Sequence, residues 1–101
     1  LINGGVAYVG GSFTLLGGQA RNNIGAVNTS TGFATAWDPD ADELVITMAI
    51  SGTTLYVGGE FTTIGGASRD GGIAALSLST GNATSWNALG PTGGIVESLV
   101  V

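Results

Sequence analysis

The sequence predicts an all-β protein made of two similar, small antiparallel sheets. The chain of 101 residues is 44% hydrophobic and only 9% charged, so it is able to bury a core, and it contains 19 glycines. Short runs rich in valine, isoleucine and threonine alternate with glycine-rich turns, a pattern typical of strands rather than helices. The sequence also repeats itself once along its length.

The repeat is clearest in two stretches that lie 48 residues apart, AYVGGSFTLLGG (7–18) and LYVGGEFTTIGG (55–66). Between Leu1 and Trp37, eleven identities at an offset of 48 and eight at an offset of 49 give 19 matches over 37 positions. The first unit covers about 1–48 and the second about 49–99. An internal period of this length identifies a repeat architecture before any other feature is considered.

The second unit predicts four strands in order, at 44–51, 53–59, 71–81 and 82–86, with a hairpin turn at Thr80-Gly81. The first unit follows the same pattern. Four short strands in such a unit is the size of one propeller blade. The predicted fold class is a β-propeller with two four-stranded antiparallel blades of about 48 residues each. The glycine pairs suit positions of positive φ or of close backbone approach.

Two blades do not close a propeller, which needs at least about four. Leu1-Ile2 aligns with Ala49-Ile50 and with Val100-Val101, so we expect one strand to be cut at both ends of the chain. Closure is expected either from further copies of the chain, such as three copies giving a ring of six blades, or from neighbouring blades of a longer array.

The phrase LYVGGEFTTIGGASR (55–69), followed by IAAL, STG and WN, resembles the bacterial delta-60 repeat, a β-propeller domain of unknown function. The same residue pattern is similar to repeats of fungal cortical polarity proteins and, more distantly, to kelch repeats. The resemblance covers nearly the whole chain. It implies a propeller on a secreted or surface-anchored protein, usually without a known ligand.

The charge and residue inventory excludes several classes of function. The net charge is −5 and the only cations are Arg21 and Arg69, so a basic surface for nucleic acid is excluded and anionic membranes are disfavoured. No apolar run is long enough to predict membrane insertion. Cysteine and histidine are absent, which removes thiol nucleophiles, Ser–His pairs and Cys/His metal sites. We expect no cofactor.

Two pairs of repeated side chains are candidate ligand-binding residues. Arg21 and Arg69 are equivalent, and each either contacts an anion or carbonyl of a ligand or binds loop carbonyls of its own blade. Trp37 and Trp86 are also equivalent, and are followed by Asp38 and Asn87. A lectin stacks sugar rings on such tryptophans, whereas the structural alternative packs each ring between blades, and we favour the structural role for both pairs.

The acidic stretch DPDADE (38–43) offers a weak Ca²⁺ candidate at Asp38, Asp40 and Asp42, with a solvated turn as the favoured alternative. The same acids, with Glu60 and Glu97, are the best carboxylates for a glycosidase pair. Asn28-Thr29-Ser30 and Asn82-Ala83-Thr84 are formal glycosylation sequons, which we interpret as coincidental in a bacterial chain.

The function expected is a non-enzymatic propeller scaffold or interaction module of an extracellular or cell-surface protein. Its partners would be further copies or neighbouring blades, with a glycan or a surface protein as a further possibility. The alternative is a small oligomeric lectin with one site per blade, and a hydrolase site is disfavoured. If the tryptophans bind sugar, changing them abolishes binding; if they are structural, changing them disrupts folding.

Overall fold

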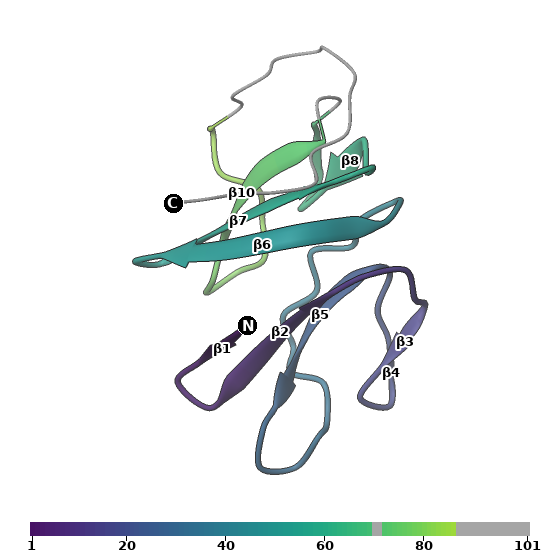
Figure 1. Cartoon of the computed structure of the whole chain (residues 1–101), viewed down its shortest axis with the longest axis vertical. Coiled ribbons are helices and arrows are strands. Elements are labelled where there is room, and N and C mark those ends of the chain that lie inside the picture. Colours follow the sequence, from purple (N-terminus) through teal and green to yellow (C-terminus); the bar gives the residue numbers. More distant parts are fainter. Residues whose placement is uncertain (70–71, 87–101) are drawn as a thin grey trace.

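The computed structural model describes residues 1–69 and 72–86, and every regular element in them is a β-strand (Figure 1). The all-β fold class is therefore confirmed. The strands of the first repeat are β1 (Ile2–Asn3), β2 (Val6–Gly10), β3 (Leu15–Leu16), β4 (Gln19–Ala20) and β5 (Ile24–Asn28). Those of the second repeat are β6 (Val45–Ser51), β7 (Thr54–Gly59), β8 (Thr63–Ile64), β9 (Ala67–Ser68) and β10 (Ile73–Ser77).

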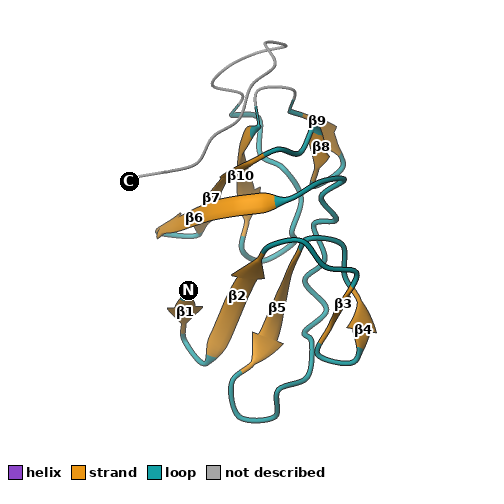
Figure 2. Ribbon diagram, turned by 45° about the vertical axis from the view of Figure 1, so that its right-hand side comes forward, coloured by secondary structure: helices purple, strands orange, loops and turns teal. Residues whose placement is uncertain are grey.

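Each repeat folds into a three-stranded antiparallel sheet and a separate two-stranded hairpin. The sheets have the orders β1-β2-β5 and β6-β7-β10, and the hairpins are β3-β4 and β8-β9 (Figure 2). The two repeats share their pairing register as well, since Tyr8 faces Ala26 in the first sheet and Tyr56 faces Ala75 in the second. The sequence duplication is thus also a duplication of structure. Neither sheet closes into a barrel.

The predicted fourth strand of each sheet is wrong in extent. In place of a strand at 82–86, a single antiparallel bridge joins Leu76 to Ala83, and an equivalent bridge joins Val27 to Ala34. Two backbone hydrogen bonds flank the second bridge, from the Ser77 amide to the Asn82 carbonyl and from the Thr84 amide to the Ala75 carbonyl. On its opposite edge the segment donates from the Ala83 N–H to the Gly65 carbonyl at 2.9 Å, so it joins β10 to the hairpin.

The hairpins β3-β4 and β8-β9 were not predicted. Both turn on a glycine pair, Gly17-Gly18 or Gly65-Gly66, whose four φ angles lie between 54° and 81°. Two consecutive residues at positive φ make the tightest hairpin turn, which only glycine adopts without strain. A different constraint acts in the other repeated glycine pair, Gly58-Gly59. A Cβ on Gly59 would lie 2.3 Å from the Leu44 carbonyl oxygen, so glycine is required there by close backbone approach.

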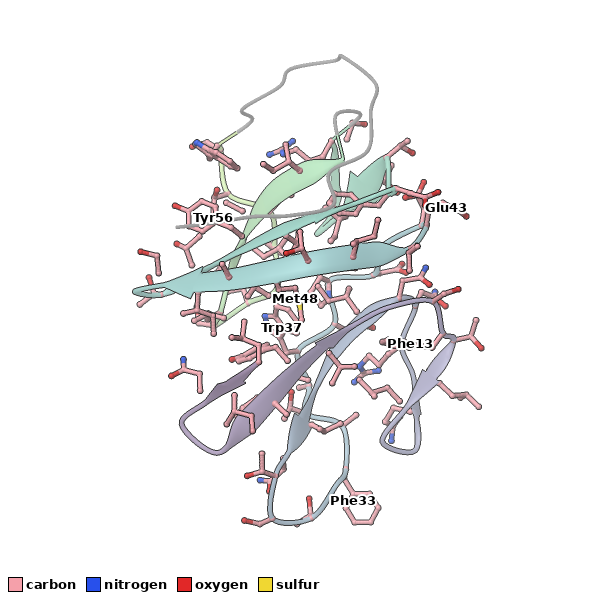
Figure 3. All side chains as sticks on the ribbon, in the orientation of Figure 1. Phe13, Phe33, Trp37, Glu43, Met48 and Tyr56 are labelled. Carbon is pink, nitrogen blue, oxygen red and sulfur yellow. The ribbon has the colours of Figure 1, made fainter. Side chains whose placement is uncertain are left out.

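The two sheets stack on each other, and the tyrosines serve to distinguish the two faces of each sheet. We call the face of each sheet that carries Tyr8 or Tyr56 its front face, and the opposite face its back face. The front face of the first sheet packs on the back face of the second, where Leu55 and Val57 are fully buried. Trp37 and Met48 lie between the sheets (Figure 3). One continuous hydrophobic core therefore spans both repeats.

Candidate functional site

The two arginines occupy the same place in their repeats and bind backbone carbonyls there. Arg69 donates from Nη1 to the Ser68 carbonyl at 2.7 Å and from Nη2 to the Thr84 carbonyl at 2.6 Å. Arg21 donates to the Ala20 and Thr35 carbonyls at 2.7 and 2.8 Å. Each guanidinium thus ties its hairpin to the bridge segment of the same repeat.

Trp37 lies in the junction between the repeats. Its ring meets Tyr8 edge to face, with centroids 5.0 Å apart, and only 7% of the residue is exposed. The indole Nε1 donates to the Ser77 carbonyl of the second repeat at 3.0 Å. A sugar ring has no access to this indole while the two repeats remain packed.

Trp86 has the same local geometry and the opposite exposure. It meets Tyr56 edge to face at 5.2 Å, as Trp37 meets Tyr8, yet 40% of it is exposed. It lies at the front face of the second sheet, which is not the face that packs on the first repeat. Asn87, predicted to accompany it, lies outside the described residues.

The three predicted acidic ligands point to three different partners. Asp38 lies 3.7 Å from Arg21 Nη1, and Asp40 accepts a hydrogen bond from the Asn22 side chain at 3.0 Å. Asp42 turns to the second repeat and accepts a hydrogen bond from Thr62 Oγ1 at 2.7 Å. Within residues 1–69 and 72–86, no group of three acidic side chains is placed to hold a metal ion.

The surroundings of Asp42 shift the pKa of its carboxylate. Partial burial raises the pKa, but hydrogen bonds from the Thr62 hydroxyl and from the Thr63 and Thr62 amides lower it by more. The pKa of Asp42 is therefore below its usual value. The carboxylate fixes the segment between the repeats onto the loop that precedes β8.

The remaining predicted residues are dispersed over the surface. Glu60 is exposed, and Glu97 lies outside the described residues. Both sequon asparagines are exposed, Asn28 at the end of β5 and Asn82 before the bridge residue Ala83. The described part of the chain encloses no pocket.

Sequence analysis missed the residues that hold the segment leading into the second repeat. Asn23 has a φ of 66° and donates from Nδ2 to the Ala41 carbonyl at 2.8 Å, while its Oδ1 accepts the Phe13 amide. In the second repeat the same position is Gly72, with a φ of 72°. An asparagine aligned with a glycine was the available signal, because both residues tolerate the left-handed conformation.

Comparisons with protein-family models, curated proteins and solved structures found no match for this chain. In the described residues, no helix has the length and apolar character needed to cross a bilayer. The strongest candidate for a binding site is the front face of the second sheet, because the 40% exposed Trp86 lies there beside the half-buried Tyr56.

Proposed function

We propose that this chain is a non-enzymatic scaffold module, made of propeller-type blades that stack front to back and present surfaces to partners. One observation carries the proposal: the front face of one repeat fits the back face of the next, and the repeated tryptophan locks the joint through the Ser77 carbonyl. Stacking of this kind is how blades contact one another in a propeller.

The hydrogen bonds made by the polar side chains support the proposed scaffold function. Both arginines, Asp42 and Asn23 all bind groups that hold hairpins or repeats in place. Residues with such positioning duties are not free to take part in a reaction. The proposed setting, an extracellular or cell-surface protein, rests on the resemblance of residues 55–69 to delta-60 repeats.

A lectin remains the second candidate, at Trp86 alone. Its exposed indole beside Tyr56 is a surface on which a pyranose ring could stack. The burial of Trp37 argues against one sugar site in each blade.

Glycan binding by the full chain decides between these two functions. The chain is tested against a panel of mono- and oligosaccharides by calorimetry, with Trp86→Ala as the paired variant. The scaffold predicts no saccharide binding by either protein. Saturable binding that is lost in Trp86→Ala, with an unchanged melting temperature, would replace the scaffold by the lectin.

A further inference from the structure

Each sheet buries one face against the other repeat and turns its other face outward. The outward faces are the front face of the second sheet and the back face of the first. The front face of the second sheet repeats the buried front face of the first: Tyr56 matches Tyr8 and Trp86 matches Trp37. The first member of each pair is less than 10% exposed, whereas Tyr56 is half-buried and Trp86 is 40% exposed. The second repeat thus presents the same surface that the first repeat buries.

The back face of the first sheet is the matching counterpart. Its strand residues Ile2, Ala7, Val9 and Val27 share one face through the pairing of β1, β2 and β5. Their equivalents Leu55, Val57 and Leu76 are fully buried in the core that the two repeats share. Ile2, by contrast, is 70% exposed. Gly25 lies on the same face but is buried beside the Leu16 and Arg21 side chains of its own repeat. The strand residues of both outward faces are uncharged.

The hydrogen bond that locks the internal junction also has its counterpart. The Ser77 carbonyl accepts the Gly81 amide at 2.8 Å and the Trp37 indole at 3.0 Å, one hydrogen bond for each lone pair. Asn28 is the residue equivalent to Ser77. Its carbonyl accepts the Gly32 amide at 2.7 Å in the same turn, which leaves one acceptor position toward the back face.

We propose that a second copy of this chain docks head to tail on the first, its first-repeat back face covering the exposed front face around Trp86. The Trp86 indole then donates to the Asn28 carbonyl of the second copy. The internal junction of the two repeats is the pattern for this contact, so the inference rests on the stacked-blade function. A heterologous contact of this kind continues from copy to copy and gives a ring where the rotation closes.

Light scattering after size exclusion, over a range of concentrations, tests the proposal on the full chain. We expect the wild type to form oligomers. Trp86→Ser removes the indole from the front face, which blocks docking there. Ile2→Arg places a charge on the back face and blocks docking on that side. Ala7→Arg is a second back-face variant, at the centre of the strand. We expect each blocked protein to be a monomer by itself.

A mixture of the two blocked proteins provides the decisive measurement. Trp86→Ser keeps an intact back face and Ile2→Arg keeps an intact front face, so the mixture can form one interface only. We expect a one-to-one dimer. A symmetric front-to-front dimer behaves differently, because Ile2→Arg would then dimerise alone, and this result would overturn the proposal.

Trp86→Phe tests the hydrogen bond separately, since phenylalanine keeps a ring beside Tyr56 but has no N–H. We expect the dissociation constant to rise by about three- to tenfold, the effect of one lost hydrogen bond. Aggregation that is insensitive to both blocking variants would also overturn the proposal.

Thermal unfolding of the same samples separates two kinds of failure. A wild-type chain that is monomeric at every concentration, yet unfolds cooperatively, refutes the docking and leaves the stacked-repeat function standing. A monomer without cooperative unfolding refutes both.

Discussion

The Trp37 indole of the first repeat donates a hydrogen bond to the Ser77 carbonyl of the second at 3.0 Å, across 40 residues of sequence. The same ring packs edge to face on Tyr8. The junction between the repeats therefore combines a directed polar contact with an apolar one. Its duplicated counterpart at Trp86 lacks the covering repeat, which makes the two tryptophans a matched pair for mutation.

Replacing Trp37 by phenylalanine should destabilise the fold. The change removes the hydrogen bond to Ser77 and leaves space in a buried junction, so we expect the free energy of unfolding to fall by about 2 kcal/mol. Denaturant unfolding at low protein concentration measures it. Trp86→Phe is the control, and its half-exposed ring should change stability by no more than about 0.5 kcal/mol. Equal losses for the two variants would contradict this account of the junction.

Replacing Arg69 by methionine should also destabilise the chain. Arg69 is 9% exposed and loses charge-assisted hydrogen bonds to the Ser68 and Thr84 carbonyls, so we expect a loss of about 3 kcal/mol. Arg21→Met removes the two equivalent carbonyl contacts and the 3.7 Å ion pair with Asp38, so we expect a loss of similar size. Thermal unfolding of both variants measures these losses. Two unaffected melting temperatures would show that the guanidinium groups do not hold the hairpins.

The glycine pair of the second hairpin allows a test of close packing. Gly65 and Gly66 both have positive φ, which strains alanine by about 1–2 kcal/mol at either position. At Gly65 a Cβ would also lie 2.5 Å from the Ala83 nitrogen, whereas at Gly66 nothing lies within 4 Å. We expect Gly65→Ala to cost at least about 2 kcal/mol more than Gly66→Ala. Equal costs would mean that backbone conformation alone requires these glycines.

Asp42 should make stability depend on pH in the acid range. Because its folded pKa is lowered, its contribution is fully present above the unfolded pKa of about 3.9 and is lost as pH falls through the folded pKa. We expect Asp42→Asn to be less stable than the wild type at pH 7, by about 1 kcal/mol after allowance for exposure. The difference should shrink as the pH falls below 4.

Thr62→Val refines the measurement on Asp42. It removes the hydroxyl donor and leaves the two backbone amides, so the pKa of Asp42 should move part of the way back to its usual value. NMR titration of the carboxyl carbon measures this shift directly. A wild-type stability curve that runs parallel to that of Asp42→Asn from neutral to acid pH would contradict the role assigned to the carboxylate.

The sequence pattern predicted the main strands because their local signals were strong. The runs at 44–51 and 53–59 became β6 and β7, which differ from the prediction by one residue at one end. The segment at 82–86 had the composition of a strand but forms one bridge with β10, while its Ala83 amide binds the Gly65 carbonyl on the opposite edge. A contact with a hairpin distant in sequence leaves no local signature.

The roles of some candidate residues were also predictable from the sequence, and those of others were not. Pairing Trp37 with Trp86 identified a junction residue, and the pairing of Arg21 with Arg69 identified two equivalent carbonyl contacts. The connections made by Asn23 and Asp42 were missed, because they form between segments that the repeat pattern treats separately.

The sequence by itself determined that two alike β units exist, because both units carry the same strand and turn residues and each hairpin turn forms between neighbouring residues. Only the tertiary structure decided which copy of each residue is buried. Burial depends on the direction of stacking: the front face of the first sheet is covered by the second repeat, which buries Trp37, while Trp86 on the outward front face stays 40% exposed. Identical local sequence therefore gives two tryptophans with different environments.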